Sequence, residues 1–164
     1  MLFIEINQQL EKMGLNIVLI EPEIPNNTGN IGRLSLASGS TLHLVKPFGF
    51  ELSDSRVKRA GLDYWQHVDI KIYESAAEFF AMHSDKNMVF FSSHGTKSVW
   101  DIPFEDGMFL VFGKESVGLA TEITDANSDK LYKIPIHSPH IRSLNLANAV
   151  GVAVYEGLRQ LLTT

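Results

Sequence analysis

The chain has 164 residues, of which 45% are hydrophobic and 20% are charged, and its formal net charge is −5. These values describe one ordinary globular domain, and they argue against a protein that coats nucleic acid by bulk charge. The absence of cysteine excludes disulfide bonds, thiolate nucleophiles and cysteine-ligated zinc. No apolar run reaches membrane-spanning length, so we expect a cytoplasmic protein without membrane contact.

Residues 1–14 are predicted to form a polar, helix-prone leader that ends at Gly14, and residues 15–164 a single domain. From residue 15 onward, short apolar runs alternate with segments of helical periodicity. Strands are predicted at 15–20, 41–45, 68–73, 88–92, 108–112 and 131–136. Helices are predicted at 28–38, 53–60, 75–83, 119–126 and 144–162. This alternation predicts an α/β fold, with a parallel sheet covered by helices on both faces.

In such sheets, ligands bind beyond the carboxyl ends of the strands, in the loops that lead into helices. The candidate loops are 21–30, 92–96, 113–118 and 135–145. Two helix starts are rich in polar residues, namely 25–33 (PNNTGNIGR) and 142–150 (RSLNLANAV). Unpaired N–H groups and the helix dipole make helix starts suitable for anionic or hydrogen-bonding ligands. Because the two segments are far apart in sequence, we expect them to form one composite site.

The first helix start is not a classical phosphate-binding loop, because the chain contains neither G-x-G-x-x-G nor G-x-x-x-x-G-K-[ST]. It can equally be a glycine-rich helix entry with a solvated Arg33. In the second helix start, Asn145 and Asn148 share one helix face, although asparagine is a poor helix former. Capping by Ser143 or Asn145 explains one of these asparagines but not both.

A third motif spans residues 111–119, where a predicted strand ends in Gly113 and Gly118 precedes the next helix. Glycines there permit positive φ and a close approach of the backbone to a flat ligand, but ordinary strand-to-helix turns use them as well. Within this motif, Glu115 can cap the helix or accept a ligand hydroxyl. No metal site is predicted, because a proline interrupts the spacing of His137 and His140 and no carboxylates accompany them.

Taken together, these motifs resemble the SPOUT class of RNA methyltransferases, and most closely the bacterial enzymes that methylate the 2′-hydroxyl of the tRNA wobble nucleotide. The resemblance is carried by residues 16–33, 59–64 (RAGLDY), 112–113, 118–119, 134–135, 142–150 and 155–156. Each segment is weak alone, whereas their order and spacing together are specific. The resemblance implies a deep trefoil knot in the C-terminal segment, and a homodimer with its sites at the subunit interface.

The resemblance also implies roles for individual residues. Those implied to bind S-adenosyl-L-methionine are Phe91, Gly113, Gly118, Ile134, Ser143 and Leu144. On the RNA side, Arg33 and Arg142 are expected to clamp phosphate and orient the 2′-hydroxyl, because arginine is a poor general base at its usual pKa. We expect Asn30, Asn145 and Tyr155 to shape that pocket. Methyl transfer of this kind requires positioning and some activation of the hydroxyl, but no metal.

The activity implied by the resemblance is 2′-O-methylation of a wobble cytidine or modified uridine, in leucine tRNAs. One alternative is the same chemistry at another tRNA position or on ribosomal RNA. Another is a non-catalytic module that binds RNA or nucleotide on the same fold. The presence of Arg33, of the Gly113 turn and of the helix start at 143–148 favours the enzyme. A nicotinamide oxidoreductase is a remote third class, because the dinucleotide fingerprint is absent.

Overall fold

In the computed structural model, the described residues are 13–53, 57 and 64–163. They form a seven-stranded sheet in the order β3-β2-β1-β6-β4-β7-β5, and all of its strand pairs are parallel. The strands are β1 (Asn16–Ile20), β2 (Thr41–Val45), β3 (Ile70–Tyr73), β4 (Met88–Phe91), β5 (Lys97–Ser98), β6 (Phe109–Phe112) and β7 (Leu131–Lys133). The α-helices are α2 (Pro25–Ser38), α4 (Ala76–Met82), α5 (Thr121–Ala126) and α6 (Leu146–Thr163). Short 3-10 turns are Trp65–His67, Val99–Asp101 and Ser128–Lys130.

The predicted α/β fold with a parallel sheet is confirmed, with differences at some strand ends. The predicted strand at 131–136 ends at Lys133, because Pro135 has no N–H with which to continue a ladder. Strand β5 was not predicted, since two residues carry no readable periodicity. The segment 1–12, most of the predicted helix at 53–60 and most of the motif at 59–64 lie outside the described residues.

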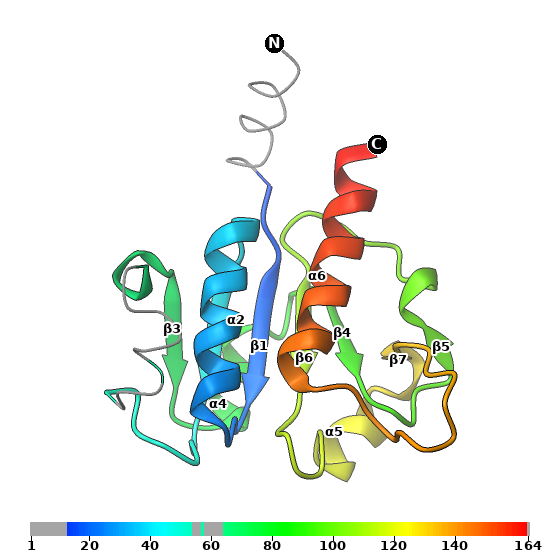
Figure 1. Cartoon of the computed structure of the whole chain (residues 1–164), viewed down its shortest axis with the longest axis horizontal. Coiled ribbons are helices and arrows are strands. Elements are labelled where there is room, and N and C mark those ends of the chain that lie inside the picture. Colours follow the sequence, from blue (N-terminus) through cyan, green and yellow to red (C-terminus); the bar gives the residue numbers. More distant parts are fainter. Residues whose placement is uncertain (1–12, 54–56, 58–63, 164) are drawn as a thin grey trace.

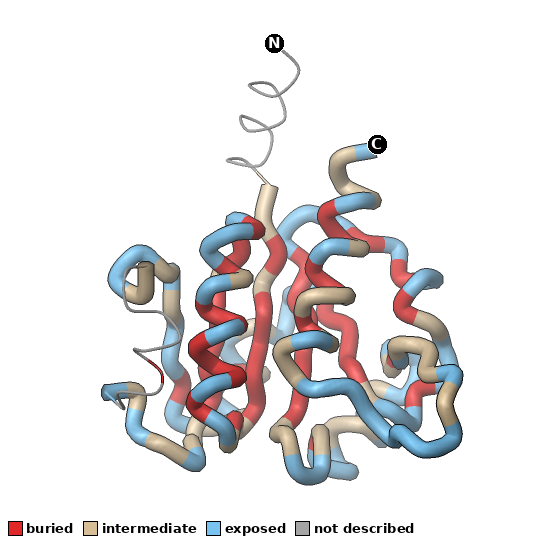
Figure 2. The backbone as a smooth tube through the Cα atoms, in the orientation of Figure 1, coloured by how far each residue is buried: buried red, intermediate tan, exposed pale blue. Residues whose placement is uncertain are grey.

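The core is divided between the two faces of the sheet, because successive side chains of a strand point to opposite faces. In β1, Ile17 and Leu19 belong to the cluster beneath α2 and α6, whereas Val18 and Ile20 belong to the cluster that contains Phe79 of α4. The same alternation holds in β4 and β6. Helices α2 and α6 lie side by side across one face, and the strands beneath them are buried (Figures 1 and 2).

Helix α2 begins three residues earlier than predicted, with Pro25 in its first turn, where the missing N–H has no cost. It ends at Gly39, which adopts a left-handed φ of 66° and donates its N–H to the Leu36 carbonyl. Because α2 follows β1 after only four residues, its polar start lies at the carboxyl end of the central strands. Helix α6 runs in the same direction beside it, so both polar starts lie at one edge of the sheet (Figure 1).

A buried polar chain crosses the α4 face of the sheet. His43 Nδ1 lies 2.8 Å from Tyr73 Oη, which lies 3.0 Å from His83 Nε2, and His43 Nε2 lies 2.8 Å from Asn16 Oδ1. Asn16 donates its amide to the Gly107 carbonyl, so its oxygen faces His43. The proton of neutral His43 is therefore on Nε2, and Nδ1 accepts from Tyr73. Burial lowers the pKa of His43 to about 4.

We expect this histidine to make the protein less stable in acid. The pKa of His43 is about 6.5 unfolded and about 4 folded, so between these values the unfolded chain binds more protons and stability falls as pH decreases. The contribution should be about 3 kcal/mol between pH 7 and pH 4. Urea unfolding at both pH values should show this loss in the native chain and in His94→Gln, an exposed control. In His43→Gln, the stability lost between pH 7 and pH 4 should be smaller by this contribution of His43. A pH dependence equal to that of the native chain would contradict the assignment.

Candidate functional site

The loops after β1 and β6 are joined by side chains at the carboxyl edge of the sheet. Lys114 Nζ forms an ion pair with Glu21 Oε2 at 2.7 Å. The Glu115 carboxylate accepts the backbone N–H groups of Glu23 and Ile24 at 2.7 and 3.1 Å. Glu115 therefore fixes the chain just before α2, whereas the sequence suggested it as a cap for the helix that follows its own loop.

A second carboxylate, on the loop after β1, contacts the loop after β6. Glu23 accepts hydrogen bonds from the backbone N–H and the hydroxyl of Ser116, at 2.8 and 2.9 Å. These bonds hold the pKa of Glu23 below its ordinary value, and the neighbouring Glu21 raises the pKa of Lys114. Both groups are consequently charged at neutral pH, and the two loops are fixed against each other.

The start of α6 is attached to the same place through Asn145. Its Oδ1 accepts the N–H groups of Ala147 and Asn148 at 2.9 and 3.4 Å, which makes it the helix cap. Its Nδ2 donates to Asn27 Oδ1 at 3.0 Å, although the two residues are 118 positions apart. Ser143, the other capping candidate, is exposed. The two polar helix starts therefore lie together, as a composite site requires.

The two glycines after β6 are required by the chain itself. A Cβ atom on Gly113 would lie 2.1 Å from the carbonyl carbon of Gly118 and 2.1 Å from the N of Leu119. Gly118 has a φ of 74°, which side-chain-bearing residues rarely adopt. Packing within the chain thus accounts for both glycines, and the predicted approach of Gly113 to a ligand stays a prediction. Its close neighbour here is the opposite strand of its own loop.

Apolar groups surround this loop. Phe91 ends β4 and stacks on Phe112, with ring centroids 4.5 Å apart and an interplanar angle of 7°. Ile134 is half-buried and packs against the same core cluster. The loops also expose large apolar side chains at Ile24, Val117, Ile141 and Leu144. Exposed apolar side chains on these loops are compatible with a partly apolar ligand.

The predicted RNA-side residues lie on different elements. Arg33 is exposed on α2, with its guanidinium carbon 5.5 Å from the centroid of the Tyr64 ring. Asn30 is exposed one turn earlier on the same helix. Arg142 is exposed in the segment that precedes α6. These three residues all lie on segments that reach the joined loops.

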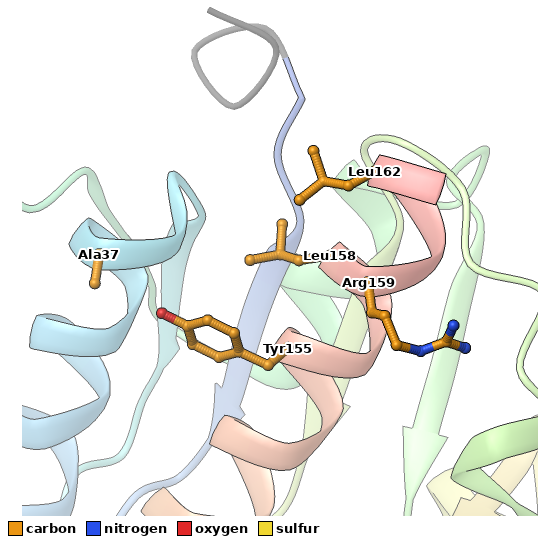
Figure 3. Close-up of a pocket in the computed structure, with 5 residues that line it drawn as sticks. All are labelled: Ala37, Tyr155, Leu158, Arg159 and Leu162. Carbon is orange, nitrogen blue, oxygen red and sulfur yellow. The ribbon is translucent and has the colours of Figure 1, made fainter. Parts of the chain in front are cut away.

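Tyr155 lies away from the joined loops. It is nine residues into α6, about 13 Å along the helix axis from Leu146, and it points toward Ala37 near the end of α2 (Figure 3). There it lines a shallow, largely apolar groove with Ala37, Leu158, Arg159 and Leu162. Its side chain is 53% exposed. Within one chain, the structure does not bring Tyr155 to the joined loops.

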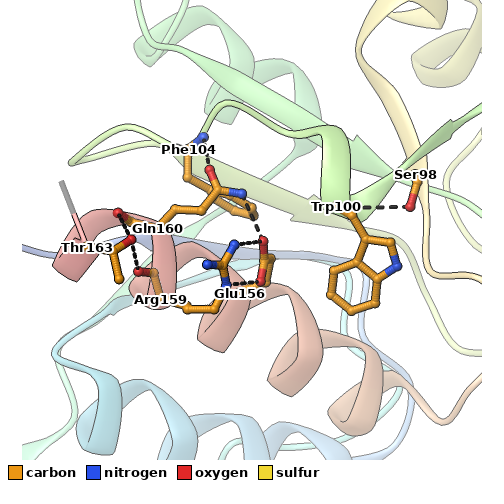
Figure 4. A network of polar contacts seen from close by, with 7 residues as sticks. All are labelled: Ser98, Trp100, Phe104, Glu156, Arg159, Gln160 and Thr163. Carbon is orange, nitrogen blue, oxygen red and sulfur yellow. Dashed lines mark hydrogen bonds and ion pairs between the residues drawn. The ribbon is translucent and has the colours of Figure 1, made fainter.

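Glu156, next to Tyr155, forms hydrogen bonds with neighbouring side chains of the same helix. Its carboxylate accepts Arg159 Nε and Nη2 at 2.8 and 2.9 Å and Gln160 Nε2 at 2.9 Å (Figure 4). These hydrogen bonds lower the pKa of Glu156 to about 2, and the bond from Arg159 has the largest effect. Gln160 in turn accepts the backbone N–H of Phe104 at 3.3 Å. This network attaches the last turns of α6 to the chain before β6.

Within the described ranges, no group of three histidine, aspartate or glutamate side chains is placed to hold a metal ion. His137 and His140 are both exposed in the segment before α6. Over the same ranges, every helix is too short or too polar to cross a bilayer.

The sequence of this chain matches a known protein family. The family model described as SpoU rRNA Methylase matches residues 14–155, most of the chain. The chain belongs to this family. The resemblance to RNA methyltransferases is therefore confirmed.

Two similar proteins of known name cover nearly the whole chain. A tRNA (cytidine(34)-2′-O)-methyltransferase of Saccharophagus degradans is 44% identical over 147 residues, which are 89% of this chain and 95% of the relative. A solved structure that concerns 2-OH methylation of C/U34 on tRNA is 47% identical with a TM-score of 0.87, and the match covers 93% of this chain and 99% of that one.

The SpoU methyltransferase AviRb of Streptomyces viridochromogenes was solved in complex with the cofactor AdoMet. It is 24% identical, with a TM-score of 0.78, and the match covers 90% of this chain and 58% of that one. At this identity the similarity shows a shared fold alone.

For this member of the SpoU family, reasoning from sequence missed part of the site. It did not identify Asn27 as a buried link, or Val117 as a side chain that is 74% exposed. Asn27 carried a readable signal, because a second asparagine next to a helix start is unusual. The exposure of Val117 had none, since an isolated valine in a turn is ordinary.

Proposed function

We propose that this chain is an S-adenosyl-L-methionine-dependent tRNA 2′-O-methyltransferase that acts on the ribose of the wobble nucleotide. The observation that carries the proposal is the convergence of three loops, after β1, after β6 and before α6, at one edge of the sheet. The names of relatives at 44% and 47% identity support the tRNA position. The substrate nucleotide is a cytidine or modified uridine, and the tRNAs are those for leucine.

The cofactor site is proposed at Phe91, Gly113, Gly118, Ile134, Ser143 and Leu144. The residues fit such a ligand, because the exposed Leu144 offers apolar surface and the exposed Ser143 offers a hydroxyl, beside the buried stack of Phe91 on Phe112. Bound S-adenosyl-L-methionine would supply an activated methyl group. The protein's part is to hold it in a fixed orientation against the ribose.

Arg33 and Arg142 are proposed to hold the RNA. Each presents a planar guanidinium with donors that match a phosphate. They fix the 2′-hydroxyl in line for attack, while Asn30 and Asn145 shape the pocket around it. No metal is needed for these tasks.

We also propose that the C-terminal segment forms the trefoil knot that the resemblance implies. Strand β7 lies beyond β4 in the sheet, yet α6, which follows it, packs against α2 on the other side of β6. Residues 134–145 therefore run back across the carboxyl ends of β4 and β6, where the 113–118 loop also lies (Figure 1). This doubled-back path supports a chain end that passes through a loop, an arrangement that is rare among folds.

The protein is proposed to act as a homodimer in the cytoplasm. The shallow apolar groove between α2 and α6 supports this, because its Tyr155, Leu158 and Leu162 side chains leave apolar surface for a second copy. In a dimer, Tyr155 is expected to help shape the pocket at the subunit interface. Basic side chains of both subunits, rather than the net charge of −5, are then expected to hold the RNA.

Two measurements test the function. Calorimetry with S-adenosylhomocysteine should show binding, and its absence at high micromolar concentration would count against the enzyme. Mass spectrometry of tRNA nucleosides from a deletion strain should show loss of one 2′-O-methylated nucleoside, restored by the native gene. Intact tRNA methylation in that strain would refute the proposed substrate.

Tyr64 offers a separate test of how Arg33 is held. A guanidinium over an aromatic face gains about 1 kcal/mol, so Tyr64→Ala should slow methyl transfer about fivefold. Tyr64→Phe keeps the ring and should stay within about twofold of the native rate. Single-turnover rates with saturating cofactor check both variants. Equal losses in the two would show that the hydroxyl, rather than the ring, matters.

A further inference from the structure

Three side chains form a line of hydrogen bonds through the joined loops. Asn27 Nδ2 donates to Glu115 Oε1 at 3.1 Å, and Asn145 Nδ2 donates to Asn27 Oδ1 at 3.0 Å. Asn145 Oδ1 then accepts the N–H of Ala147 in the first turn of α6. Asn27 is buried at the centre of this line, with 5% of its surface exposed. We call these three residues, Glu115, Asn27 and Asn145, the amide relay.

The direction of the amide relay is fixed at both ends. An ionised carboxylate can only accept, so Asn27 must turn its NH₂ group toward Glu115. A backbone N–H can only donate, so Asn145 must turn its oxygen toward Ala147. The NH₂ of Asn145 then meets the oxygen of Asn27, so each contact along the line pairs a donor with an acceptor. Rotation of either amide would set two donors or two acceptors against each other.

The amide relay is also the polar attachment of the segment before α6. Among the described residues, the side-chain hydrogen bonds that join segment 134–145 to the rest of the molecule all involve Asn145. The other bond in that segment is internal, from His140 N to Ser138 Oγ. Arg142 and Ser143 lie two or three residues from Asn145, so its orientation sets where they are presented.

We propose that Glu115 and Asn27 are positioning residues, which orient Asn145 and thereby hold Arg142 and Ser143 in place for cofactor and RNA. This proposal rests on the proposed function only for its cofactor-binding test. The hydrogen bonds of the relay belong to the ligand-free protein, so the exchange test is independent of that function. Asn145 accordingly acts through its cap and its bond to Asn27.

Exchanging the charge between two positions tests the direction of the relay. In Asn27→Asp, two carboxylates face each other across about 3 Å, and neither can donate. In the double variant Asn27→Asp with Glu115→Gln, the new amide at 115 donates to the new carboxylate at 27, which still accepts from Asn145. The N–H of Ile24, an exposed residue, is then left to water. The polarity of the line is restored with the same net charge as in the native chain.

The main readout is hydrogen exchange of the Ala147 and Asn148 backbone amides in the ligand-free protein. Asn27→Asp should accelerate it at least about tenfold, because repulsion between the carboxylates at 27 and 115 displaces residue 27, and with it the Asn145 side chain that caps the helix. The double variant should return to within about threefold of Glu115→Gln alone. Asn30→Asp, which adds the same charge at an exposed position of the same helix, should leave this exchange unchanged.

Asn145→Asp separates the cap from the link. The aspartate still accepts from Ala147, so the cap survives, but it has no NH₂ for Asn27. Exchange at Ala147 should stay within about threefold of native, whereas affinity for S-adenosylhomocysteine should fall about tenfold.

Slow exchange in Asn27→Asp, or a double variant no better than Asn27→Asp alone, would overturn the relay. Native cofactor affinity in Asn145→Asp would overturn its positioning role. If the native protein binds S-adenosylhomocysteine but methylates no tRNA, the proposed substrate fails while the relay stands. Circular dichroism and thermal unfolding of each variant confirm that it has folded before exchange is compared.

Discussion

Replacing Arg33 by alanine is expected to slow methyl transfer to tRNA about a hundredfold or more while leaving affinity for S-adenosylhomocysteine within about twofold of native. Arg33 lies on α2, away from the residues proposed for the cofactor, and its guanidinium is exposed over Tyr64. Its removal should therefore affect the acceptor alone. Single-turnover methylation and calorimetry on the same preparation measure the two quantities.

Arg33→Lys is the matched variant, because it keeps the charge but loses the planar pair of donors. An intermediate rate in this variant would indicate bidentate contact with phosphate, and a native rate would indicate charge alone. A large loss of cofactor affinity in Arg33→Ala would refute the assigned role.

Gly113→Val is expected to disrupt the cofactor loop from within. Its Cβ would lie 2.1 Å from backbone atoms of Gly118 and Leu119, and these peptides cannot rotate away as a side chain would. We expect the free energy of unfolding to fall by about 3 kcal/mol or more, and cofactor affinity to fall at least tenfold. Urea unfolding followed by calorimetry under native conditions separates the two effects.

Gly151→Ala is the control, because a Cβ at that position of α6 meets nothing within 4 Å. It should raise stability by about 0.5–1 kcal/mol, since alanine is the better helix residue. Native stability in Gly113→Val would show that the loop can open, and would contradict the packing argument.

The sequence was most informative where hydrophobic periodicity and neighbouring positions determine structure. The runs that became β1, β2 and β4 were located within a residue at each end, because buried parallel strands are continuously apolar. Strand β7 was too long in the prediction, and Lys97–Ser98 was missed, because edge pairing depends on distant partners.

The same distinction applies to the site. Polar residues at both helix starts indicated a composite site, since a helix start has unpaired donors whatever surrounds it. The choice between Ser143 and Asn145 as cap could not be made from sequence, because it depends on Asn27, which is 118 positions away from Asn145. Whether Gly113 faces a ligand or its own loop likewise depends on tertiary packing.

The amide relay joins residues that are 88 and 118 positions apart in the chain. Such long closures are completed late in folding, because the entropy of bringing distant segments together is lost before the contacts form. The proposed cofactor site thus exists only once the last helix has docked, and an incomplete chain has no partial version of it. A ligand that binds there stabilises the whole fold, by about 2.7 kcal/mol at a hundred times its dissociation constant.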